Sequence, residues 1–346
     1  MLKTAIRKLR SPTVLPIPWT NTVGLARTLL ALGAALTLVA SSPDSVFSYR
    51  LGTGPTPACD GAKSILAFCL LPRDQIAVPY ILAICVLLVA ASGWRPRLTA
   101  IPQWYVHLSL FIGMSAPDGG DQLAAILSLI LIPIGLTDAR IWHWSRLEAI
   151  PSDSPSRGDQ WRVAAGVICI VTAKVQVSVV YFQAGVAKLS HPEWADGTAF
   201  YYWSTDPAFG VPTWLAVPVR WVMENPYLVV WFAWIPMLLE VCLAAGCLFK
   251  VQHRKYLLGA AFVFHLSIAI LMGLWSFAFT MWAAALILLG PVGYQLADWL
   301  PGRRRKCALL MNFTKSQRSP TGIPPAPTTG PSQQPAPLPK ALDNIV

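Results

Sequence analysis

Charged side chains are scarce in this sequence. Asp, Glu, Lys and Arg make up 12% of the 346 residues, whereas 55% of the residues are hydrophobic. Ordinary soluble domains carry about twice that charged share, so these charges are too few to cover a water-soluble globule. The excess of 27 basic over 16 acidic residues is spread along the flanks of apolar runs rather than gathered in one patch, so we expect no nucleic-acid partner. The lipid bilayer is the expected surrounding of this chain.

Long apolar runs predict an all-α integral membrane protein. Each run is about as long as a helix that crosses the ~30 Å hydrocarbon core, or slightly shorter. We expect a bundle of about eight transmembrane helices, and the count stays open between seven and nine because the fourth run is short and the last two adjoin. The runs lie at 24–41, 75–93, 98–115, 122–136, 163–186, 227–249, 256–272 and 275–297.

The distribution of Lys and Arg predicts the sidedness of the bundle. Basic residues lie before the first run, after the last one and in the loops that follow the even-numbered runs, which places both termini in the cytoplasm. We expect a basic cytoplasmic N-terminus at 1–23, a transmembrane domain at 24–300, and a basic, then Pro-rich and disordered cytoplasmic tail at 301–346. A cleavable signal peptide within residues 1–45 is the alternative interpretation of the basic start and first apolar run.

Cysteine spacing indicates one disulfide and no metal site. Cys59 and Cys69 lie in the loop after the first run, on the side predicted to be outside, where an oxidising compartment favours their pairing. Two free thiols are the alternative. The other five cysteines lack the spacing of metal ligands, so we interpret them as packing residues.

Ionisable residues inside apolar runs are candidates for function because their burial in a membrane is costly. Counted from the inner ends of their runs, His107, Lys174, Glu240 and His265 reach similar depths, so we expect a buried polar core. Glu240 is the carboxylate available to neutralise Lys174, as a structural ion pair or as part of a functional core.

A second candidate site lies where the fifth run ends. Lys174, Ser178, Tyr181, Gly185 and Lys188 follow at intervals of three or four and share one helix face, and the small Ala184 and Gly185 leave room for a flat ring. Together with the loops on the same side, this face is compatible with a pocket. The alternative is that the loop glycines form turns and that Tyr201, Tyr202, Trp203 and Trp214 form an interfacial aromatic belt. The candidate catalytic residues are Lys188, Tyr181, His191 and Asp121, and the candidate substrate-binding residues are Trp194, Asp196, Gly197, Tyr201 and Tyr202.

Several motifs resemble those of one family. The run Tyr181-Phe182-Gln183-Ala184-Gly185-Val186-Ala187-Lys188-Leu189, followed by Trp194 and Gly197, is similar to the signature of the HTTM family, a transmembrane domain related to vitamin K-dependent gamma-carboxylase. Gly119-Gly120-Asp121-Gln122, the segment from Ile132 to Arg140, and Trp142-His143-Trp144 resemble the sporulation-delaying protein B (SdpB) branch. The resemblance covers residues 20–300.

This resemblance implies a bacterial cytoplasmic membrane protein that helps to mature or export a secreted antimicrobial peptide. The implied partners are the toxin precursor and a small SdpA-like protein. In the carboxylases a lysine at the place of Lys188 deprotonates a reduced quinone, which makes a quinone the implied cofactor. Ala187 stands where the carboxylases have a second lysine, so glutamate carboxylation is not expected. Whether the chain is an enzyme stays open; the alternative is a non-enzymatic scaffold or small transporter built on the buried Lys/Glu/His core.

Overall fold

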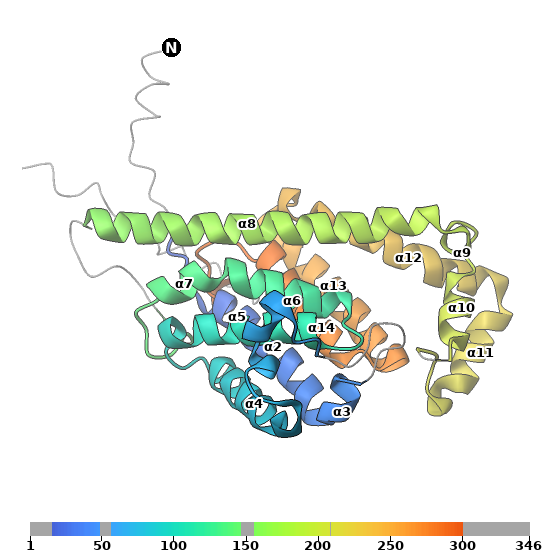
Figure 1. The fold of residues 1–346 in the computed structure, drawn as a ribbon. Coiled ribbons are helices and arrows are strands. Elements are labelled where there is room, and N and C mark those ends of the chain that lie inside the picture. Colours follow the sequence, from blue (N-terminus) through green and yellow to red (C-terminus); the bar gives the residue numbers. More distant parts are fainter. Residues whose placement is uncertain (1–15, 49–56, 147–155, 208, 300–346) are drawn as a thin grey trace, which may run out of the picture. The chain divides into compact units, whose positions relative to one another are not determined.

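The computed structural model describes residues 16–48, 57–146, 156–207 and 209–299. The regular secondary structure of this part consists of helices and one isolated bridge between Trp94 and Trp142. Of the expected basic N-terminus at 1–23, residues 1–15 lie outside the described part, as does the whole of the expected basic and Pro-rich tail at 301–346. Figure 1 shows the arrangement of the helices. The longer helices are α2 (Asn21–Ala40), α4 (Ala77–Ser92), α5 (Pro96–Gly113), α6 (Gly119–Ile130), α8 (Arg157–Ala187), α12 (Pro226–Ala244), α13 (Val251–Met272) and α14 (Trp275–Leu289).

Each of the eight apolar runs coincides with a helix of this series, the fourth with α6 and the short α7 (Ile132–Thr137). This agreement is expected, because a backbone in lipid must satisfy its hydrogen bonds internally and a helix does so. Within the described ranges, five helical segments are long and apolar enough to cross a membrane: α2, α6 with α7, α8, α12 and α13. The helices α4 and α14 are apolar but shorter, so the number of eight spans stays a prediction.

Side-chain caps set several helix starts. The Asp118 carboxylate accepts the N–H of Asp121, and the Asp121 carboxylate accepts the N–H of Asp118 in return, which forms a capping box at α6. The Ser156 hydroxyl accepts the N–H of Asp159 at the start of α8, and the Asn225 side chain accepts the N–H groups of Tyr227 and Leu228 at the start of α12. Each cap satisfies backbone donors that the first turn of a helix leaves unpaired.

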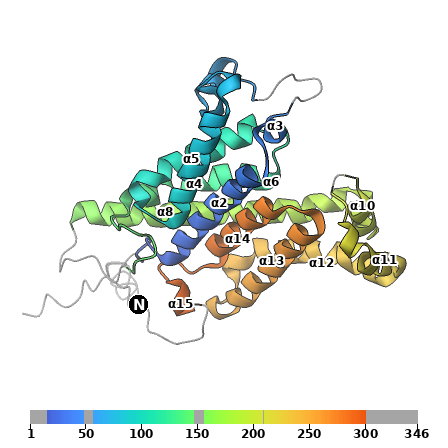
Figure 2. The ribbon, with the colours of Figure 1, turned by 90° about the horizontal axis from the view of Figure 1, so that it is seen from below.

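The core centres on α2 and α14, which lie side by side in Figure 2. Leu30, Leu127 and Leu288 are fully buried there. A second apolar cluster joins α2 to α4 and α5 and includes Phe47, Phe68 and Tyr80. Close to this cluster, Cys59 and Cys69 form a disulfide, with Cα atoms 5.4 Å apart. The sequence therefore predicts the pairing that the structure has.

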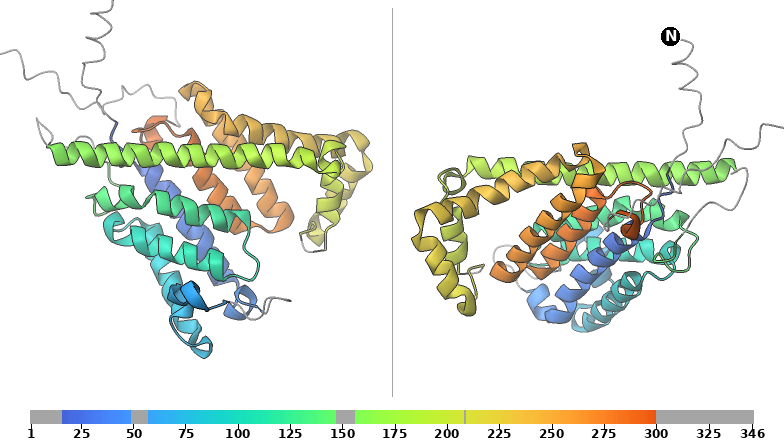
Figure 3. Two further views of the ribbon diagram at one scale, coloured as in Figure 1. Left: turned by 45° about the horizontal axis from the view of Figure 1, so that its top comes forward. Right: turned by 180° about the vertical axis from the view of Figure 1, so that it is seen from behind.

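Short elements connect α8 to α12 and lie at the C-terminal end of α8 (Figure 3). They are η4 (Lys188–Ser190), α9 (Pro192–Ala195), α10 (Ala199–Thr205), η5 (Thr213–Leu215) and α11 (Ala216–Glu224). Gly197 fixes this connection to α12. Its φ of +86° favours glycine, and an added Cβ would lie 2.9 Å from Cγ2 of Val230 on α12.

Candidate functional site

Lys188 lies immediately after the last residue of α8, and its side chain is anchored on two sides. The ammonium Nζ forms an ion pair and hydrogen bond with Oε2 of Glu240 on α12. It also lies 5.1 Å from the centre of the Trp194 ring, within the range of a cation–π contact. The Glu240 side chain is 7% exposed and the Lys188 side chain 23%. The carboxylate is therefore buried, while the lysine beside it stays partly accessible.

A second polar pair lies close to this ion pair. The hydroxyl of Tyr181 on α8 and Nε2 of His265 on α13 are 3.0 Å apart, and both side chains are buried. Tyr181 lies on the same face of α8 as Lys188, two turns earlier. We call these four side chains, which come from α8 and its C-terminal end, α12 and α13, the Lys188 cluster.

Close packing of α8 against α12 brings this cluster together. At Gly185 an added Cβ would lie 3.1 Å from Cγ2 of Val241, 3.2 Å from the Met237 carbonyl oxygen and 3.3 Å from Cβ of Glu240. The absent side chain lets α12 approach α8, as small residues commonly do between membrane helices. The expectation that Gly185 leaves room for a flat ring is therefore wrong, because α12 fills that space.

Lys174 has other partners than the expected one. Its ammonium donates to the carbonyl oxygens of Ile287, Leu288 and Gly290, at 2.7, 2.7 and 2.6 Å. The last carbonyls of a helix lack intrahelical donors and carry partial negative charge, so the end of α14 can accept an ammonium without a carboxylate. The predicted Lys174–Glu240 pair is wrong.

The register between α8 and α12 explains this correction. The hydroxyl of Ser178 donates to the carbonyl of Ala244, the last residue of α12. Because the two helices run in opposite directions, Lys174, one turn before Ser178, lies beyond the end of α12. Side chains on a helix tilt toward its N-terminus, so Lys188 reaches back along α8 to Glu240.

The expected buried core is also divided. His265 and Glu240 belong to the Lys188 cluster, whereas His107 is buried on α5. In the part of the chain that the structure describes, no hydrogen bond is assigned to Nε2 of His107. The helix that carries it, α5, packs against α4, α6 and α7.

The remaining predicted residues separate into distinct local roles. Asp121 belongs to the capping box of α6. His191 is exposed, and its backbone N–H donates to the carbonyl of Lys188. Tyr201 and Tyr202 are exposed and form an edge-on ring pair with centroids 5.6 Å apart. Of the predicted loop residues, Trp194 is the one whose side chain contacts Lys188.

Asp196 stabilises the turn that follows Trp194. Its Oδ1 accepts the backbone N–H of Thr198 at 2.9 Å and the Thr198 hydroxyl at 2.6 Å. These hydrogen bonds favour the ionised carboxylate, so the side-chain bond, followed by the backbone bond, lowers the pKa of Asp196. Asp196, Glu193 and Asp206 border an open cavity of about 400 Å³ together with Tyr202 and Trp203.

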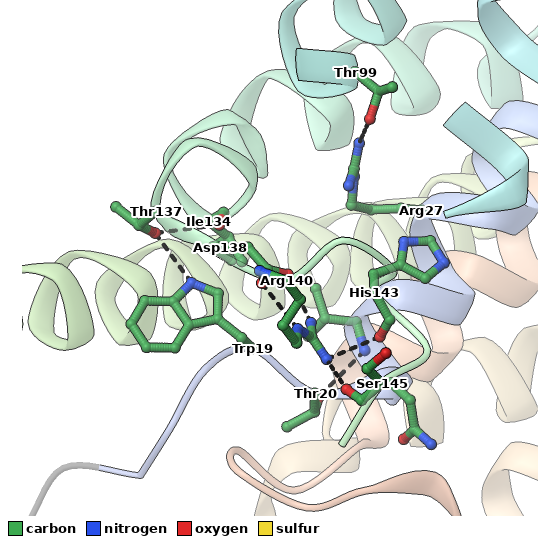
Figure 4. Close-up of polar contacts among 12 residues, drawn as sticks. Trp19, Thr20, Arg27, Thr99, Ile134, Thr137, Asp138, Arg140, His143 and Ser145 are labelled. Atoms are coloured by element: carbon green, nitrogen blue, oxygen red, sulfur yellow. Dashed lines mark hydrogen bonds and ion pairs between the residues drawn. The ribbon is translucent and has the colours of Figure 1, made fainter. Parts of the chain in front are cut away.

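The sequence reasoning missed a polar cluster near the N-terminal end of α2 (Figure 4). Arg27, 4% exposed within an apolar run, donates to Thr99 and Gln103 of α5. Asp138 binds Arg140 through both carboxylate oxygens, and Arg140 also donates to the carbonyls of His143 and Ser145. An arginine inside the run 24–41 was the available signal. The geometry indicates a structural role for this cluster in folding the loop after α7.

Sequence comparisons relate this chain to known proteins. The HTTM domain family matches residues 137–292, a range that contains all four members of the Lys188 cluster. YitO of Bacillus subtilis (strain 168) is 33% identical over 279 residues, which cover 80% of this chain and 87% of YitO. The sporulation-delaying protein SdpB of the same organism is 32% identical over 277 residues, which cover 80% of this chain and 83% of SdpB. No solved structure matches. The chain therefore belongs to the family of SdpB and YitO and carries its HTTM domain.

Proposed function

We propose that this chain is a multi-pass cell membrane component of an SdpB-like system that produces a secreted peptide toxin. The similarity to the sporulation-delaying protein SdpB supports this role, as do the helices long and apolar enough to cross a membrane. The proposed role is in maturing or exporting the peptide, with the toxin precursor and a small SdpA-like protein as partners. Both termini are proposed to be cytoplasmic, which puts Lys188 and α9–α11 toward the outside.

Lys188 is the proposed general base. A lysine accepts a proton only in its neutral form. The Glu240 carboxylate is buried and a buried charge is costly, so transfer of one proton from the ammonium to the carboxylate would leave both groups neutral. The Glu240 carboxylate, in direct contact with Nζ, is placed to take that proton. The partial exposure of Lys188 beneath Trp194 is the observation that carries this proposal.

A reduced quinone is not part of the proposal. The small residues expected to admit a flat ring beside Lys188 are in contact with α12 at Gly185. The residues present do not fit the ring there, so no step is derived through it. The proposed acid that gives its proton to Lys188 is a group of the peptide precursor or of a co-substrate near the Trp194 turn.

The test is toxin production by Lys188→Ala at unchanged membrane level. Lys255 offers a matched control, because its Nζ also lies over an aromatic ring, 5.0 Å from the centroid of Tyr256. We expect at least a hundredfold loss for Lys188→Ala and less than a twofold change for Lys255→Ala. Normal toxin production by Lys188→Ala would refute the proposal and favour a scaffold or transporter.

A further inference from the structure

A stripe of exposed apolar side chains runs along η5 and α11. Trp214, Val217 and Trp221 are 69%, 78% and 66% exposed. They lie three and four residues apart and therefore share one face of the helix. Val219, which points the other way, is 5% exposed and packs onto the rest of the protein. The segment is therefore amphipathic, with a protein-facing side and an uncovered aromatic side.

The surroundings of this stripe show which medium covers it. The segment between α8 and α12 carries exposed charges, including Asp196, Arg220 and Glu224, and charges at this density do not lie in a hydrocarbon core. Two tryptophans that are two thirds exposed are equally unsuited to water. Amphipathic helices with tryptophan on one side and charges nearby lie at the boundary between headgroups and acyl chains.

The stripe also adjoins the exposed apolar side of α12. Asn225, the cap of α12, follows α11 directly. The first turns of α12 expose Tyr227 and Trp231, at 78% and 57%. α12 is apolar and long enough to cross a membrane. Its exposed side must therefore face acyl chains, and the α11 stripe adjoins it.

A second protein copy is a poorer occupant than lipid. Aromatic side chains bury roughly 150–250 Å² each, so two tryptophans and a valine provide roughly 600 Å² at most. A stable protein interface needs about 800 Å² from each partner. The stripe is too small for a dimer by itself, whereas each tryptophan inserted into a bilayer contributes independently.

We infer that α11 is a membrane-interface anchor whose Trp214, Val217 and Trp221 insert into the phospholipid leaflet at this end of the bundle. The anchor holds the α9–α11 connection, and with it the Trp194 ring that covers Lys188, at the membrane surface. This inference does not depend on Lys188 chemistry, and it applies equally to a scaffold or a transporter.

The experiment uses the full chain, labelled with 5-fluorotryptophan, in phosphatidylcholine/phosphatidylglycerol nanodiscs. Trp214→Phe and Trp221→Phe assign the two ¹⁹F signals. Each signal is then recorded with a lipid nitroxide at acyl carbon 5 and, separately, with a water-soluble gadolinium chelate. Trp282, which is 8% exposed and packed against Phe262 and Phe279, serves as a buried reference.

We expect the lipid nitroxide to broaden the Trp214 and Trp221 signals at least threefold more than the soluble chelate does. Val217→Glu, which places a charge in the middle of the stripe, should at least halve the lipid effect on both signals. Broadening by the soluble chelate alone would show that the stripe faces water. Protection from both agents would show that protein covers it. Either of these results would overturn the inference.

Discussion

Lys174 and Lys188 lie on the same face of α8, about 21 Å apart along the helix, yet their surroundings differ. Three carbonyl oxygens at the end of α14 surround the Lys174 ammonium, and its side chain is buried. Lys188 contacts one carboxylate and one aromatic ring and stays partly exposed. Carbonyls stabilise the charged ammonium but cannot take its proton, whereas a carboxylate can. The comparison supports the proposal that Lys174 is a structural lysine and Lys188 a reactive one.

The largest effect on stability is expected at Lys174. Lys174→Met would leave three buried carbonyls without their donor, which we expect to cost about 3 kcal/mol of unfolding free energy. Val175, the next residue along α8, is 58% exposed, so Val175→Ala provides a control that should cost less than about 0.5 kcal/mol. Thermal unfolding in detergent measures both. Equal, small losses would show that the carbonyl contacts contribute little.

The second expectation concerns which lysine is coupled to Glu240. In a double-mutant cycle, Lys188→Met and Glu240→Gln should show a coupling energy of about 1–3 kcal/mol because the two side chains are in direct contact. The same cycle with Lys174→Met should be additive within about 0.5 kcal/mol. Unfolding in detergent again provides the measurement. Coupling of Glu240 to Lys174 rather than to Lys188 would contradict the Lys188–Glu240 ion pair.

A smaller effect is expected where α8 and α12 touch. Gly185→Ala adds a methyl group 3.1–3.3 Å from atoms of Val241, Met237 and Glu240, so the helices must shift, at a cost of about 1 kcal/mol. Gly259 on α13 has no heavy atom within 4 Å of an added Cβ, and Gly259→Ala should be neutral or slightly stabilising. Unfolding of the two variants under one condition separates packing from helix propensity. A stable Gly185→Ala protein would contradict the close contact.

The smallest effect concerns the turn beside Lys188. The Thr198 hydroxyl contributes to lowering the pKa of Asp196, so Thr198→Val should raise that pKa. Because the pKa of Asp196 is lowered in the folded protein, its stabilisation of the turn is present above the unfolded-state pKa. It is lost as pH falls through the folded-state pKa. A ¹³C NMR titration of labelled aspartate carboxyls measures the shift, and an unchanged Asp196 pKa would contradict the hydrogen bond.

Much of the helical fold follows from sequence alone, because apolar run length is enough to locate a membrane helix. The predicted ends of the helices were less accurate, and this error led to the wrong ion pair in the predicted site. α8 begins at Arg157, six residues before the predicted run, and α12 ends at Ala244, five residues before the predicted end. Depths counted from the predicted ends therefore placed Lys174 and Glu240 at one level.

The partners of Lys174 and Lys188 could not be predicted from the sequence because they lie far away along the chain. Glu240 is 52 residues from Lys188, and the carbonyls that bind Lys174 are more than 110 residues away. Those carbonyls belong to the backbone. Every residue has one, so the sequence does not show which of them bind Lys174. The spacing of Tyr181, Gly185 and Lys188 predicts a shared face, but the register of α8 against α12 decides what that face meets.

Toxin production by Lys188→Arg, compared with Lys188→Ala at equal membrane levels, tests the central claim most directly. Arginine keeps the positive charge, the contact with Glu240 and the position over Trp194, but it does not give up its proton near neutral pH. If Lys188 acts as a base, Lys188→Arg should be as inactive as Lys188→Ala. Full toxin production by Lys188→Arg would show that only the charge matters and would contradict the proton-transfer role.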